Sequence, residues 1–189
     1  MSDHTHDHSW FRTHYPSLQD AYCLTLVEGV PAGELLRRAG ALSGPWVTGI
    51  DAVCEAAENL EAETGGERML VAVADLADGW TLVLEPNGYL GVHEETIAAW
   101  ADTTLVSHFR NVNASTRFCW YANGTARLRT EDMAPGTVSA AVPDFDPAPY
   151  PDRTELALAL AEHLTGVHLT PELLEGTPFA TGTVDEPWN

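Results

Sequence analysis

Residues 103–124 read TTLVSHFRNVNASTRFCWYANG. Apolar and aromatic side chains mix with polar ones on both sides of an Asn-Ala pair at 113–114, which is typical of two half-buried strands. An Asn-Gly pair at 123–124 then favours a type I′ turn into a third strand at 125–131. Strands joined by such short connections pair with opposite directions, so this stretch predicts an antiparallel meander.

The segments around this stretch extend the sheet. Residues 68–76 and 80–86 are predicted strands joined across an Ala-Asp-Gly turn, and residues 178–184 form a final strand. Helical periodicity and helix-ending residues predict helices in the remaining ordered segments. We expect helices at 17–30, 31–40, 48–66, 94–102, 153–167 and 169–176.

Two of these helices have explicit end signals. In the first, Ser17 is the predicted N-terminal cap and Gly29 the predicted end. In the helix that starts near residue 153, Thr154 is the predicted cap and Gly166 the predicted end. These signals, together with the strands, predict an α+β fold.

We expect a five- to six-stranded antiparallel sheet with helices packed mainly on one face. The order of elements predicts one domain over residues 10–184. Its longest irregular segment is a proline-rich loop at 133–152. Residues 1–9 form a predicted disordered tail that contains histidines, and residues 185–189 form a C-terminal tail.

The charge of the chain is far from balanced. In 189 residues it has 28 acidic and 9 basic side chains, a formal net charge of −19, and every basic residue is arginine. The electrostatic field of such a negative charge repels phosphate backbones, which disfavours nucleic-acid binding. The same field favours a basic protein partner. The arginine-only composition suggests a high-GC genome or a salt-adapted host.

No signal peptide and no membrane-spanning apolar run is apparent, so we expect a cytoplasmic protein without membrane contact. Cys23, Cys54 and Cys119 lie beside apolar neighbours without CxxC spacing, which predicts buried free thiols. The sequence does not predict the oligomeric state.

No catalytic constellation or cofactor motif stands out, so we assign no catalytic residue and no cofactor. His4, His6 and His8 could converge on one transition-metal ion in an extended chain. A frayed polar terminus explains the same three residues without an ion, so we predict no metal site.

The candidate site is a patch on the two strands of residues 103–124. We expect Phe109 to face Phe118 or Trp120 towards the core, and His108, Arg110, Arg117 and Tyr121 to share the opposite face. Two of the chain's nine arginines and one of its eight histidines would then form, together with Tyr121, a cationic and aromatic patch.

Two interpretations of this patch remain open. The arginines could be neutralised by internal acids such as Asp75, Glu85 or Glu131, under covering helices. Alternatively, they could form an anion or partner site, because the guanidinium group matches carboxylate and phosphate geometry.

Several blocks resemble a domain family that is widespread in actinobacteria and has no known function. The blocks are YPSLQDAYCLTLVEGV, GWTLVLEPNGYLGV, VSHFRNVNASTRFCW and LTGVHLTPELLEG. The resemblance spans residues 10–184 and implies a soluble single-domain protein, with no activity or site to carry over. The layout is also similar to that of small acidic immunity proteins.

We therefore predict a non-enzymatic acidic protein-binding module, such as an immunity or regulatory factor, for a basic partner. The alternative is a small-molecule or anion-binding protein, or an enzyme, with its site around His108, Arg110 and Arg117. Mimicry of nucleic-acid charge ranks third.

Overall fold

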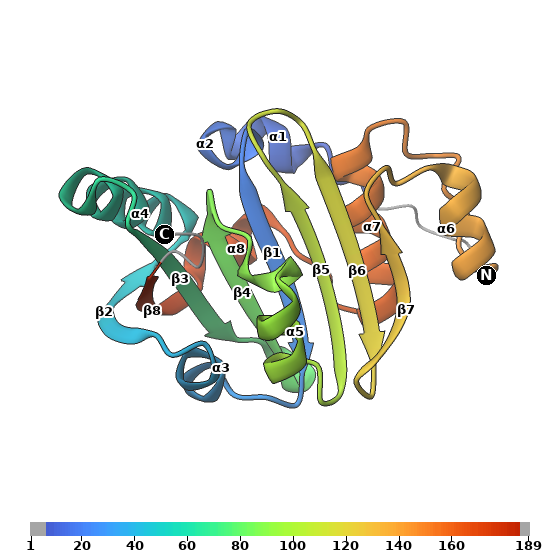
Figure 1. Ribbon diagram of the computed structural model, residues 1–189. Coiled ribbons are helices and arrows are strands. Elements are labelled where there is room, and N and C mark those ends of the chain that lie inside the picture. Colours follow the sequence, from blue (N-terminus) through green and yellow to red (C-terminus); the bar gives the residue numbers. More distant parts are fainter. Residues whose placement is uncertain (1–6, 186–189) are drawn as a thin grey trace.

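The computed structural model describes residues 7–185, and Figure 1 shows a sheet flanked by helices. Within these residues eight strands form one antiparallel sheet in the order β2-β8-β3-β4-β1-β5-β6-β7. The α+β class and the antiparallel sheet are confirmed, but the expectation of five or six strands is wrong. The strands are β1 (Tyr22–Glu28), β2 (Leu42–Thr48), β3 (Arg68–Asp75), β4 (Trp80–Pro86), β5 (Thr104–Arg110), β6 (Thr116–Ala122), β7 (Thr125–Thr130) and β8 (Pro178–Asp185).

The first unexpected strand, β1, lies near the middle of the sheet. It pairs with β4 on one side and with β5 on the other, where the sequence predicted a helix. Its residues from Tyr22 to Val27 are all buried. A strand covered on both faces reads as a continuous apolar run instead of an alternating one, so the sequence lacked the usual strand signal.

The second unexpected strand, β2, is an edge strand that pairs only with β8. Its side chains are almost all exposed, and its register shifts between Ser43 and Trp46, where Gly44 and Pro45 interrupt it. Exposure, glycine and proline all weaken a strand pattern, which explains why this segment was missed.

Helices lie against both faces of the sheet. The face that carries Tyr22, called the Tyr22 face, packs against α1, α2, α4, α6, α7 and α8. The opposite face, called the Cys23 face, packs against α3, η2 and α5, so most of these helices lie on the Tyr22 face although both faces are covered. In Figure 1, α5 stands in front of the sheet and α7 behind it. The helices are α1 (Trp10–His14), α2 (Pro16–Gln19), α3 (Ala32–Arg38), α4 (Ile50–Thr64), α5 (Glu94–Trp100), α6 (Pro135–Ala141), α7 (Arg153–Thr165) and α8 (Pro171–Gly176), with 3₁₀ turns η1 (Ala77–Gly79) and η2 (Leu90–Val92).

Local signals were right about turns and less reliable about caps. Asn123 and Gly124 have φ angles of 50° and 70°, as the predicted type I′ turn requires. The cap of α7 is Asp152, whose side chain accepts hydrogen bonds from the backbone N–H groups of Thr154 and Glu155. The prediction of Thr154 as the cap is therefore wrong.

Two segments expected to be irregular contain ordered contacts. The proline-rich segment 133–152 includes α6. Residues 1–6 of the predicted tail lie outside the described residues, but His8 is buried, with its Nε2 3.2 Å from an Oε2 of Glu162. None of the helices in residues 7–185 is both long enough and apolar enough to cross a bilayer.

Candidate functional site

The four residues of the predicted patch do not share one face. Across β5 and β6, His108 lies opposite Phe118, and Phe109 lies opposite Arg117. Opposed residues of an antiparallel pair project from the same face, so the predicted register is wrong by one residue. His108 and Arg110 therefore lie on the Tyr22 face, whereas Arg117 and Tyr121 lie on the Cys23 face.

His108 is a core residue. It is 2% exposed, and its Nδ1 lies 2.7 Å from the Tyr22 hydroxyl. Burial, and secondarily the positive charge of Arg110, lowers the pKa of His108 to about 3. The imidazole is thus neutral at physiological pH, and its Nε2 has no hydrogen-bond partner among the described residues.

Arg110 lines a small cavity of about 50 Å³ together with Arg12, Asp152 and Thr154. The Nη1 of Arg12 donates to an Asp152 oxygen at 3.0 Å, so a carboxylate already balances positive charge here. The volume suits one or two water molecules and is too small for a metabolite. The cavity offers little support for the predicted small-molecule site.

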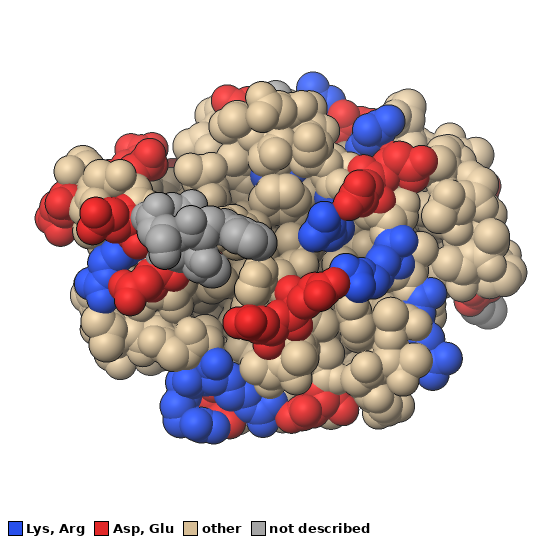
Figure 2. Space-filling view, in the orientation of Figure 1, with Lys and Arg blue, Asp and Glu red and all other residues tan. Residues whose placement is uncertain are grey.

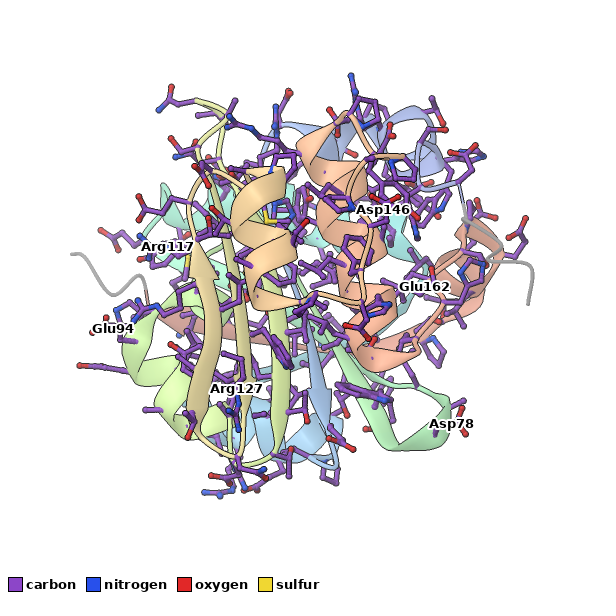
Figure 3. All side chains as sticks on the ribbon, turned by 90° about the vertical axis from the view of Figure 1, so that its right-hand side faces the viewer. Asp78, Glu94, Arg117, Arg127, Asp146 and Glu162 are labelled. Atoms are coloured by element: carbon purple, nitrogen blue, oxygen red, sulfur yellow. The ribbon has the colours of Figure 1, made fainter. Side chains whose placement is uncertain are left out.

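On the Cys23 face, Arg117 and Arg129 are held in ion pairs. The Nη2 of Arg117 lies 2.9 Å from Glu131, and the Nη2 of Arg129 lies 3.3 Å from Glu94. Figure 3 shows Arg117 and Glu94 on one side of the sheet and Glu162 on the other. Neutralisation of Arg117 by Glu131 is therefore as the internal-acid interpretation expected.

A larger cavity of about 290 Å³ opens between α2, α4 and the adjoining ends of β3 and β4, and we call it the α4 groove. Its apolar lining includes Ala21, Cys54, Ala57 and Leu70, all within or next to these elements. Val112, which is 72% exposed in the β5–β6 connection, also lines it. The groove thus has an apolar surface that is open to an incoming side chain.

Carboxylates line the same groove as these apolar residues. Asp20, Glu58 and Glu61 line the α4 groove, and all three are exposed. Within residues 7–185 none of the three forms an ion pair, whereas Arg68 of the same groove is bound to Asp185. The acids of the groove are therefore not neutralised by the described chain.

The acidic character continues along α4. Its exposed side chains include Asp51, Glu55 and Glu63, which add to the acids that line the groove. Figure 2 shows acidic side chains gathered over α4 at the left of the molecule. This surface was not assigned from the sequence, although the outward acids of the predicted helix at 48–66 were a signal for it.

The thiol within the α4 groove is not a nucleophile at neutral pH. Cys54 is 6% exposed, and burial raises its pKa to about 11, with further effects from Ser17, Asp51 and Glu58. Thiols react as thiolates, so a protonated Cys54 contributes apolar surface and no covalent chemistry. Cys23 and Cys119 are also free and buried, which confirms the prediction for all three cysteines.

Glu85, on the Cys23 face, has a buried carboxyl group with a role that the sequence did not predict. Glu85 is 0% exposed, and it accepts hydrogen bonds from the backbone N–H groups of Leu90 at 2.7 Å and Gly91 at 3.0 Å. Burial raises its pKa to about 7. Glu85 therefore holds η2 on the sheet and does not neutralise the predicted patch.

The histidine cluster gives no support for a metal site in the described chain. His4 and His6 lie outside residues 7–185, and His8 is engaged with Glu162. Among the described residues no group of three or more His, Cys, Asp or Glu side chains is arranged to hold a metal ion. The triple-histidine interpretation therefore stays untested.

Comparison with known proteins identifies the family. The model of a family of unknown function (DUF6461) matches residues 1–146 and 144–188, so the chain belongs to that family. No curated protein and no solved structure gave a match. The resemblance to a family of unknown function is confirmed.

Proposed function

We propose that this member of the family is a protein-binding module that docks a basic protein partner through the α4 groove. The observation that carries the proposal is that Asp20, Glu58 and Glu61 line a partly apolar cavity and form no ion pair within residues 7–185. A partner that supplies both positive charge and apolar contact would match this surface.

The same features favour binding over catalysis. His108 is buried and neutral, and Cys54 is held protonated. Neither group combines exposure with a pKa near neutrality, which general acid–base or nucleophilic chemistry would need. We therefore propose a non-enzymatic role, such as an immunity or regulatory factor.

The net charge of −19 supports the same partner class. A strongly acidic surface steers basic partners into encounter and repels nucleic acid. We do not extend the proposal to an anion site, because His108 and Arg117 project from opposite faces of the sheet. We further propose an actinobacterial origin and a cytoplasmic location, where Cys23, Cys54 and Cys119 would remain reduced.

A titration with a defined probe tests the proposal. The probe is a synthetic peptide that contains several arginines separated by glycine and alanine, and its counterpart has glutamates in place of the arginines. We expect the basic peptide to bind the isotope-labelled protein, as followed by NMR, and binding to weaken as salt is raised to about 0.3 M. Equal binding of the acidic peptide, or no binding of either, would contradict the proposal.

A matched pair of variants localises the binding. Asp20→Asn combined with Glu58→Gln and Glu61→Gln removes three carboxylates of the α4 groove. Asp78→Asn combined with Glu95→Gln and Glu175→Gln removes three exposed carboxylates from η1, α5 and α8. Both triple variants remove three negative charges, so they differ only in where the charges are lost. We expect only the first to lower the affinity for the basic peptide, by about tenfold or more.

A further inference from the structure

We infer that the α4 groove receives the side chain of a single arginine from the partner. This inference rests on the proposed function and adds the chemical identity of the anchor. It is drawn from the shape and lining of the groove and not from the overall charge.

The volume of the groove fits one long side chain. At about 290 Å³ it lies just below the size of about 300 Å³ at which pockets for drug-sized ligands begin. A folded partner cannot enter such a space, but one extended side chain can. The groove is therefore better suited to an anchor residue within a larger contact surface.

The walls match the aliphatic stem of arginine. Ala21, Ala57 and Leu70 come from three different elements or connections and give the cavity apolar sides. Long basic side chains bury their methylene groups on such surfaces and keep the charged head at the solvent boundary. An aspartate or glutamate could not do so here, because carboxylates already line the groove.

The carboxylates favour a guanidinium head. Glu58 and Glu61 are three residues apart on α4 and therefore project from the same side of the helix. Asp20 follows α2 and lines the same groove. A guanidinium group has five N–H donors in a plane and can serve several carboxylates at once, whereas an ammonium group acts as a point charge.

Arg68 of this chain does not occupy the position proposed for the partner's arginine. Arg68 also lines the groove, but its Nε lies 3.2 Å from an Oδ1 of Asp185. Its charge is thus directed to a carboxylate outside the set of Asp20, Glu58 and Glu61. An incoming arginine would meet carboxylates that the described chain leaves without an ion pair.

The test uses three capped tripeptides, glycine–X–glycine, in which X is arginine, lysine or citrulline. Citrulline keeps the shape of arginine without its charge. We expect the arginine peptide to shift NMR signals of residues around the α4 groove, and the citrulline peptide to bind about tenfold more weakly. The lysine peptide should rank between them.

Two variants separate the anchor from general charge attraction. Ala57→Leu fills the groove without changing charge, so it should abolish the effect of the arginine tripeptide and largely preserve binding of the multi-arginine peptide. If Ala57→Leu disturbs folding, as judged from its amide spectrum, the smaller uncharged replacement Ala57→Val serves the same purpose. Thr64→Val, at a half-buried site on the same helix that does not line the groove, is the control for substitution in α4.

The outcomes distinguish this inference from the proposed function. Equal binding of arginine and citrulline tripeptides, or shifts spread over all exposed carboxylates, would overturn the anchor. The proposed function would still stand if the multi-arginine peptide binds with salt dependence. If that peptide does not bind at all, both fail together.

Discussion

The hydroxyl oxygen of Tyr22 and the Nδ1 of His108 lie 2.7 Å apart, between neighbouring strands in the interior of the protein. Burial raises the pKa of Tyr22 and lowers that of His108 to about 3, so both groups are neutral. The contact is therefore a hydrogen bond between neutral partners within the core. His108, which the sequence analysis placed in a candidate binding patch, therefore has a structural contact in the core.

Removing this hydroxyl should destabilise the fold. Tyr22→Phe leaves the Nδ1 of His108 without its partner in a dry environment, at an expected loss of about 1–3 kcal/mol in the free energy of unfolding. Urea denaturation followed by tryptophan fluorescence measures the change. Tyr121→Phe is the control, because Tyr121 is half-buried and its hydroxyl forms no hydrogen bond with any of the described residues. This variant should change stability by less than about 0.5 kcal/mol. Equal losses in the two variants would contradict the assigned role of the Tyr22 hydroxyl.

Glu85 should make stability depend on pH in the direction opposite to that of an ion-paired acid. Its pKa is raised from 4.5 to about 7, so the folded protein binds this proton more tightly than the unfolded chain does. Its stabilising contribution is complete below pH 4.5, falls as pH rises towards about 7, and is constant above that. The full change is about 3 kcal/mol.

The comparison with Glu85→Gln isolates this effect from the other titrating groups. We expect the difference in unfolding free energy between the two proteins to change across this pH window, with the parent losing stability relative to the variant as pH rises. Chemical denaturation at several pH values provides the measurement. A constant difference from pH 4 to pH 8 would show that Glu85 does not titrate as described.

Gly91 should tolerate no larger residue. A Cβ at this position would overlap the Thr25 Oγ1 and lie 2.7 Å from the Ser107 Oγ, both of which are buried. Gly91→Ala is therefore expected to cost about 1–3 kcal/mol through overpacking. Gly33→Ala, in α3 with open space around the new Cβ, should instead stabilise the protein by about 0.5–1 kcal/mol.

Thermal unfolding of both glycine variants checks this prediction. Combining Gly91→Ala with Thr25→Ala removes the overlapped hydroxyl and should recover part of the lost stability. If the double variant loses at least as much stability as the two single variants lose in sum, the overlap is not the cause of the destabilisation.

Asp152 should contribute to stability both as a cap and as an ion-pair partner. Its Oδ1 accepts from the N–H groups of Thr154 at 2.9 Å and Glu155 at 3.2 Å, and its Oδ2 pairs with Arg12. Asp152→Ala loses both contributions and should cost about 1–2 kcal/mol. Asp152→Asn keeps a capping oxygen and should cost less than about 1 kcal/mol, because the ion pair is partly exposed.

The two Asp152 variants are compared by thermal and urea denaturation under the same conditions. Restoring most of the stability with asparagine would assign the main contribution to the cap. Equal losses for alanine and asparagine would instead assign it to the contact with Arg12.

The sequence predicted most elements but missed one strand near the centre of the sheet, β1, and one at its edge, β2. The amphipathic pattern of α4 and the Asn123-Gly124 turn were sufficient to place both correctly. The segment Tyr22–Val27 was not, because burial from both sides removed the alternation on which strand prediction depends. Its flanking residues Ser17 and Gly29 also satisfy the requirements of helix ends, so the local signals favoured the wrong element.

The candidate site could be predicted only in part, for a geometric reason. The alternation of side chains within β5 and β6 was clear, but the five-residue connection between Arg110 and Thr116 leaves their pairing open. A change of one residue in register moves every side chain of one strand to the opposite face. The α4 groove was beyond local patterns altogether, because Asp20, Glu58 and Leu70 meet only after the sheet has formed.

The position of β8 has a consequence for how the protein is made. β8 lies between β2 and β3, although more than a hundred residues separate it from either strand along the chain. During synthesis, β2 therefore has no neighbour to pair with until Pro178–Asp185 has left the ribosome. The nascent chain therefore carries β2 unpaired while more than a hundred further residues are made, and this part of the sheet closes only when β8 becomes available.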